Sequence, residues 1–129
     1  MTAALFVDTH IVLWVRIAPE RLTAPERRAL ETAHFRYVSG VTLWEIAILM
    51  TLDRVDRDQR LFDIPDGFDL LPIRPEHCTA LITLPKLHRD PLDRMLIAQA
   101  RAEDMPLLTR DKAIIAYGLH GARLVAADR

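Results

Sequence analysis

Four carboxylates, Asp8, Glu45, Asp93 and Asp111, each lie beside an apolar run of the sequence. Taken singly, an acid in such a place caps a helix, complements the helix dipole or forms an ion pair. Taken together they would repel, because two unit charges about 4 Å apart interact by ~4 kcal/mol at an effective dielectric of about 20. Some must then protonate or bind a cation. Oxygen ligands without Cys or His favour Mg²⁺ or Mn²⁺, and such a centre suits hydrolysis of a phosphodiester bond by a metal-activated water.

Basic side chains accompany these acids and could hold the phosphates of a substrate. The candidates are Lys86, Arg89, Arg94, Arg110 and Lys112. An equal interpretation makes them solvated surface charges or partners of the acids. The formal net charge of the chain is −1, whereas a protein that holds nucleic acid by its overall field is usually clearly basic. A polyanion would therefore be held by a local patch, a metal or a partner's surface.

The elements that must position these side chains alternate along the chain. Short apolar runs predict strands at 3–7, 35–39, 70–73, 105–109 and 124–127. Helical patterns with start and stop signals predict helices at 9–18, 23–34, 41–50, 57–62, 75–83, 90–103 and 112–117. Alternation of this kind implies an α/β fold, a central parallel sheet flanked by helices on both faces. The acids that follow strands would then share the carboxyl edge of the sheet, where ligands bind in such folds.

Two helical segments carry informative acids. Thr23 followed by Glu26 predicts a capping box. Glu45 shares a helical face with Val41, Ile48 and Leu52 by spacing, which predicts that it lies on an apolar stripe. An unpaired buried carboxylate is unfavourable, so Glu45 should have a partner or a purpose.

Length and composition limit the classes of protein to which the chain can belong. With 129 residues, half of them hydrophobic and 27% charged, the chain is expected to form a single domain over 1–129. No apolar window is long enough to span a bilayer, and the N-terminus lacks the pattern of a signal peptide. The lone Cys78 excludes an internal disulfide and fits a reducing cytoplasm, and one Cys with five His offers no zinc-binding spacing. We expect a cytoplasmic protein without a membrane partner.

Five segments resemble the motifs of PIN-domain ribonucleases and, more narrowly, those of the VapC toxins of bacterial toxin–antitoxin pairs. They are residues 5–10, 41–47, 84–85, 88–100 and 108–111, which together cover nearly the whole chain in order. The resemblance implies a metal-dependent endoribonuclease that cuts RNA to leave a 5′-phosphate. It further implies a homodimer and inhibition by a small VapB-type antitoxin, which would bind DNA in place of this chain.

Carried over by position, Asp8, Glu45, Asp93 and Asp111 match the acidic catalytic site of that family. The resemblance implies Asp8 and Asp93 as the metal ligands, with Glu45 and Asp111 as candidates for further ligands. It implies accessory roles for three further residues, Asp90, Thr9 and Thr109. The chain departs from the pattern at Leu49 and Asp53, where many relatives have Lys and Gly. An apolar Leu49 removes a contact that RNA or phosphate could use.

Other readings of the same residues are weaker. A haloacid-dehalogenase-type phosphatase needs a second Asp two residues after the first, where this chain has His10. The acids of a receiver-type phosphoacceptor domain would cluster nearer the N-terminus. Nucleophilic catalysis has little support, because Cys78 has no evident base and no GxSxG is present.

The strongest rival is an inactive PIN-like module that acts only by binding a partner, such as the antitoxin. The helices that carry Trp14 and Trp44 could supply its apolar surface, although Trp in such helices is more often a core residue. Retention of all four acids favours catalysis, because a binding module gains nothing from mutual carboxylate repulsion.

Overall fold

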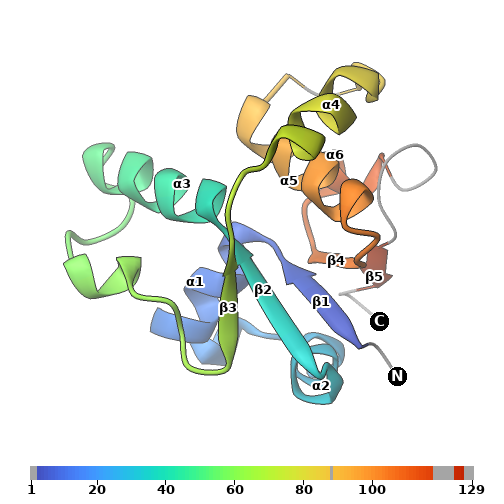
Figure 1. The fold of residues 1–129 in the computed structure, drawn as a ribbon. Coiled ribbons are helices and arrows are strands. Elements are labelled where there is room, and N and C mark those ends of the chain that lie inside the picture. The colour runs from blue at the N-terminus through green and yellow to red at the C-terminus, as the bar shows by residue number, and fades with distance from the viewer. Residues whose placement is uncertain (1–2, 88, 118–123, 127–129) are drawn as a thin grey trace.

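A parallel sheet forms the centre of the computed structural model, which describes residues 3–87, 89–117 and 124–126. Within these residues the sheet has five strands in the order β3-β2-β1-β4-β5, and every pair is parallel. The strands are β1 (Ala4–Val7), β2 (Phe35–Ser39), β3 (Phe68–Leu71), β4 (Leu107–Thr109) and β5 (Leu124–Ala126). Figure 1 shows them side by side, with the helices arranged around them.

The helices follow the predicted order. They are α1 (Thr9–Ile17), η1 (Pro19–Arg21), α2 (Ala24–Thr32), α3 (Gly40–Thr51), η2 (Gln59–Phe62), α4 (Pro75–Thr83), α5 (Pro91–Ala102) and α6 (Lys112–Ile115). Helical caps form where the sequence predicts them, including the capping box between Thr23 and Glu26. None of the helices among the described residues is long and apolar enough to cross a membrane.

Several predicted boundaries are wrong by a few residues. The third strand ends before Pro72 and starts at Phe68, because pairing with β2 begins at Arg36 opposite Phe68. The strand predicted from Met105 starts at Leu107, since the Met105 amide still bonds to the Ala100 carbonyl at the end of α5. The helix predicted over 57–62 is one 3₁₀ turn, and that over 112–117 ends at Ile115. Ala127, the last residue of the predicted fifth strand, lies outside the described residues.

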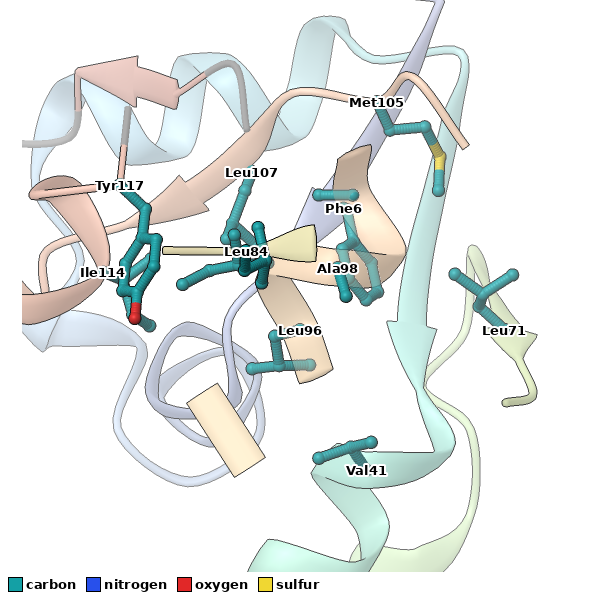
Figure 2. Packing of buried hydrophobic residues seen from close by; sticks show 12 residues of the cluster. Phe6, Val41, Leu71, Leu84, Leu96, Ala98, Met105, Leu107, Ile114 and Tyr117 are labelled. Atoms are coloured by element: carbon teal, nitrogen blue, oxygen red, sulfur yellow. The ribbon is translucent and has the colours of Figure 1, made fainter. Parts of the chain in front are cut away.

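Successive residues of β1 face opposite sides of the sheet and so belong to two separate cores. Phe6 packs into a cluster with residues of α5, such as Leu96 and Ala98, and with Tyr117 (Figure 2). Leu5 and Val7 pack into a second cluster built with α1 and α2. The prediction of a parallel sheet flanked by helices on both faces is therefore confirmed.

Helix α3 packs differently from the prediction. Its buried residues are Val41, Thr42, Ile46 and Met50, and the last two join a small cluster with α1 and η2. The predicted stripe that ended at Leu52 is therefore not the buried face, and Leu52 is exposed. Glu45 is half-buried at the margin of the packed face. The expectation of core tryptophans is wrong for Trp44, which is 58% exposed, while Trp14 is half-buried.

The turn that ends α3 explains one departure from the family pattern. Asp53 has a φ of 56°, the left-handed conformation that glycine adopts without steric cost. The Arg54 amide bonds to the Leu49 carbonyl at 2.9 Å and the Asp53 amide to the Met50 carbonyl at 3.1 Å. This is the hydrogen-bond pattern of a Schellman motif, with aspartate in the position where glycine is common.

Candidate functional site

Asp8 lies at the carboxyl end of the central strand β1. The strand that precedes it, β1, pairs with β2 on one side and with β4 on the other. The chain first builds outward through β2 and β3 and later crosses to β4 and β5, so the carboxyl end of β1 is a topological switch point, the usual ligand position in α/β sheets. The aspartate caps α1, and its side chain is only 4% exposed.

Both oxygens of the Asp8 carboxylate accept hydrogen bonds. The Thr9 amide donates to Oδ1 at 2.7 Å, and the Thr109 hydroxyl donates to Oδ2 at 2.8 Å. Thr109 Oγ1 in turn accepts from the Asp111 amide at 3.0 Å. Because Asp111 Oδ1 caps α6 by accepting from the Ala113 amide at 2.8 Å, one chain of hydrogen bonds joins the ends of β1 and β4.

The environment of Asp8 makes its charge unfavourable. Burial, and to a smaller extent repulsion by Glu45, raise the pKa of its carboxyl, which lies at about 6 once all contributions are combined. The hydrogen bond from Thr109, the charge of His10 and the Thr9 amide lower the pKa, but by less in sum. Asp8 is therefore poised to take up either a proton or a cation near neutral pH.

Glu45 lies in the second turn of α3, close enough to Asp8 to raise its pKa, and polar contacts fix the start of that helix. The Ser39 hydroxyl accepts from the Val41 amide at 2.9 Å and donates to Gln99 Oε1 at 2.6 Å, which fixes the first turn. The hydroxyls of Thr42 and Thr9 meet at 2.9 Å and tie α3 to α1.

One oxygen of Glu45 is not satisfied by the described part of the fold. Glu45 Oε1 is buried and has no hydrogen-bond partner among the described residues. Such an orphaned acceptor is unfavourable unless a donor or a cation joins it. An unpartnered carboxylate oxygen near a second carboxylate of raised pKa fits a hard divalent cation held by oxygen ligands.

Two further candidate acids, Asp90 and Asp93, lie at the start of α5. Asp90 caps α5, accepting from the Leu92 amide at 2.9 Å, and Asp93 lies buried in the first turn of the same helix. Helices α3 and α5 pack against each other, which brings the elements that carry Glu45 and Asp93 together. Across residues 3–87, 89–117 and 124–126, however, no three acidic, His or Cys side chains form a ready-made metal-binding set. Asp8 and Glu45 are close enough to interact, but the four acids do not form one preformed cluster among these residues, so their convergence on one metal stays a prediction.

Two of the predicted phosphate-binding arginines have structural contacts. Arg94 Nη1 donates to the Pro85 carbonyl and the Tyr117 hydroxyl, each at 3.0 Å, and so fastens the segment before α5. Arg110 Nε donates to Glu26 Oε2 at 2.5 Å, and its Nη2 donates to Glu26 Oε1 at 2.9 Å. The other candidates, Lys86, Arg89 and Lys112, are exposed.

A cleft of about 240 Å³ opens beside Asp8. It is lined by Asp8, His10, Ile11, Trp14, Arg110 and Asp111. The guanidinium carbon of Arg110 lies 4.1 Å from the centroid of the Trp14 ring. The cleft therefore combines two of the predicted acids with an aromatic ring and a planar cation.

Sequence reasoning missed three residues of this region. Thr42 has a recognisable signal, a polar residue three positions before Glu45 in an otherwise apolar helix. Glu26 was assigned only its capping box, which exists, but the same carboxylate also binds Arg110. Trp14 lies one helical turn after His10, so both side chains lie on one side of α1.

The model of the PIN domain family matches residues 5–118 of the chain. Among curated proteins, the chain is similar to Ribonuclease VapC22 of Mycobacterium tuberculosis (strain ATCC 25618 / H37Rv). The two are 26% identical over 119 residues, which cover 88% of this chain and 91% of that protein.

Solved structures of similar fold include toxin–antitoxin complexes. VapBC2 from Rickettsia felis, bound to a DNA fragment from its promoter, gives a TM-score of 0.71 at 15% identity, covering 94% of this chain and 96% of that chain. FitAcB from Neisseria gonorrhoeae gives a TM-score of 0.70 at 15% identity, with 95% and 97% covered. A toxin–antitoxin complex from Klebsiella pneumoniae gives 0.62 at 21% identity, with 96% and 97% covered. At these identities the likeness shows the fold.

Proposed function

Because the chain belongs to the PIN domain family, we propose that it is a metal-dependent endoribonuclease and the VapC-type toxin of a toxin–antitoxin pair. The relative whose name states an activity is a ribonuclease. The observation that carries the proposal is the pairing of Asp8, a buried carboxylate whose pKa is raised to about 6, with the unpartnered Glu45 Oε1. A divalent cation would satisfy both groups at the place where α/β folds bind ligands.

Asp8 and Asp93 would hold Mg²⁺ or Mn²⁺, with Glu45, whose Oε1 has no hydrogen-bond partner among the described residues, and Asp111 as further ligands. When bound, the metal supplies an activated water and stabilises the charge on the departing oxygen of the phosphodiester. The chain's own contribution is orientation. The Thr109 hydroxyl and the Thr9 amide fix the Asp8 carboxylate, and the pair of Thr9 and Thr42 fixes α3 against α1.

The proposal includes a VapB-type antitoxin and a second copy of the chain as partners. One of the similar structures is a toxin–antitoxin complex, and another is VapBC2 bound to a DNA fragment from its promoter. DNA would reach this chain through the antitoxin. Trp44, which is 58% exposed on α3, offers apolar surface to such a partner. That same residue favours the alternative of a module that acts by partner binding alone.

Cleavage of pooled cellular RNA tests the proposal. The purified chain is incubated with Mg²⁺, with Mn²⁺ and with EDTA, beside Asp8→Asn and Asp93→Asn. Because the metal contributes several kcal/mol to stabilising the transition state, we expect each variant to lose about 1,000-fold or more in rate. Asp66→Asn, an exposed acid in the turn before β3, is the matched control and should cleave like the native chain.

A second measurement separates the outcomes. In the native chain Mn²⁺ should raise the melting temperature, and in Asp8→Asn it should not. If the native chain shows neither metal-dependent cuts nor a metal-dependent melt, the acids are helix caps and the partner-binding module is the better account.

A further inference from the structure

We propose that the cleft beside Asp8 binds a single unpaired RNA base next to the cleaved phosphate, stacked on the guanidinium of Arg110. This inference rests on the proposed nuclease function and deepens it. It assigns Arg110 and Trp14 a role in recognising bases. Neither residue is among the proposed metal ligands.

Arg110 is held as a rigid plane. Its Nε and Nη2 atoms donate to the two oxygens of Glu26, and Nη2 also donates to the Arg21 carbonyl at 2.7 Å. These bonds lie in the plane of the guanidinium, so they fix its orientation and leave its two faces for stacking. One face lies over Trp14, at 4.1 Å from the ring centroid.

The charge of this arginine is already offset. Glu26 is fully buried and forms an ion pair with it, while the Arg110 side chain remains 32% exposed. A cation paired in this way is a weak clamp for a phosphate but a good flat surface, since arginine planes and aromatic rings are what RNA-binding proteins stack bases on. This assignment replaces the phosphate contact predicted for Arg110 from the sequence.

The shape of the cleft fits one base. Its volume of about 240 Å³ lies below the ~300–1,000 Å³ of pockets that enclose drug-sized ligands. The ring of His10, 6.1 Å from that of Trp14, and the apolar side chain of Ile11 complete the lining. Asp8 and Asp111 line the same cleft, so a base held there would belong to a nucleotide beside the metal site.

The two tryptophans of the chain allow a direct test. Trp44→Phe leaves Trp14 as the only tryptophan, and Trp14→Phe leaves Trp44, which does not line the cleft. Each variant is titrated in EDTA with a short unstructured RNA and with an abasic RNA of the same length. We expect the fluorescence of Trp14 to change with the base-bearing RNA only, and that of Trp44 to change with neither. A Trp14 response that is absent, or equal for the abasic RNA, would overturn the inference.

A cleavage experiment separates this inference from the proposed function. Trp14→Leu and Arg110→Lys should weaken binding of the base-bearing RNA about tenfold, because each removes part of the surface on which the base stacks. They should also broaden the sequence profile at the cut sites, whereas the control Phe35→Leu, at an exposed aromatic residue at the start of β2, should change neither. If the native chain cuts RNA but both variants keep the native affinity and profile, the base site is refuted and the nuclease stands. If the native chain does not cut at all, the proposed function fails, and the fluorescence titration still decides whether the cleft takes a base.

Discussion

Asp8 and Glu26 are both buried carboxylates at the start of a helix, Asp8 as the cap of α1 and Glu26 in the first turn of α2. Glu26 has a guanidinium against it, since Arg110 binds both of its oxygens. Asp8 accepts from an amide and a hydroxyl instead, and burial raises its pKa to about 6. The two acids are therefore buried to a similar degree, but only Glu26 has a positively charged partner that neutralises it.

The difference teaches how to tell a structural acid from a functional one. An acid that is buried with a cation is satisfied within the fold, and its removal should affect stability first. An acid that is buried beside another acid keeps an unfavourable charge that only a proton or an external cation relieves. Asp8 is of the second kind, and its neighbour Glu45 contributes to the penalty.

The largest expected effect comes from breaking the ion pair of Glu26. Glu26→Gln keeps the shape of the side chain but leaves Arg110 without its counter-charge, so we expect a loss of about 2–3 kcal/mol in the free energy of unfolding. The value is at the low end for buried pairs because Arg110 is partly exposed. Urea denaturation measures it. Glu31→Gln, an exposed acid on the same helix, should stay within about 0.5 kcal/mol of the native chain.

Removing the charge of Asp8 should raise the free energy of unfolding, the opposite of the effect expected at Glu26. Because its pKa is raised from 3.8 to about 6, the folded chain binds the proton more tightly than the unfolded chain. The stability contributed by this group is therefore greatest below pH 4 and is lost as the pH rises through 6. The full shift corresponds to about 3 kcal/mol, so Asp8→Asn should stabilise the metal-free fold by about 1–2 kcal/mol at neutral pH after the loss of hydrogen bonding.

Urea denaturation in EDTA at acidic and at neutral pH checks this expectation. The gain from Asp8→Asn should shrink as the pH falls through 6 toward 4, where the carboxyl of the folded chain is already protonated. We expect a gain of the same sign for the buried Asp93→Asn, as the crowding of acids implies. An equal gain at both pH values would show that the helix cap, and not the charge, sets the effect.

Asp53 should give the smallest effect. It contrasts with Asp8 and Glu26 because the effect of replacing it comes from backbone conformation and not from charge. Asp53→Gly relieves the left-handed conformation at the end of α3 and should stabilise the fold by about 1 kcal/mol. The gain should be independent of pH between 4 and 8 and of added metal. Thermal melts with and without Mn²⁺ measure it. A gain that grows with pH would place Asp53 among the repelling acids.

Much of the fold could be predicted because its signals are local. The apolar runs of β1 and β2 and the caps Asp8, Thr23, Asp90 and Asp111 each depend on residues one to three positions apart. Such contacts are favoured by the local sequence alone. The boundaries that were wrong depend on partners elsewhere, as for Phe68, whose pairing with Arg36 starts β3 two residues early.

The candidate site was only partly predictable for the same reason. The sequence indicated which acids to consider, but the burial of one face of α3 depends on contacts with α1 and η2, which no spacing within α3 encodes. The resemblance to PIN domains supplied the positions of the acids, and the match over residues 5–118 confirms that family.

By itself the sequence determined the order of strands and helices, the caps that start the helices and the residue types of an oxygen-ligand site. Only the tertiary structure decided how each acid is neutralised. Thr109 meets Asp8 across 101 positions of the chain, and Arg110 meets Glu26 across 84. Pairing at such separations depends on how the strands are ordered and packed. That order places Arg110 against Glu26 and leaves the charge of Asp8 to be balanced by a proton or a bound cation.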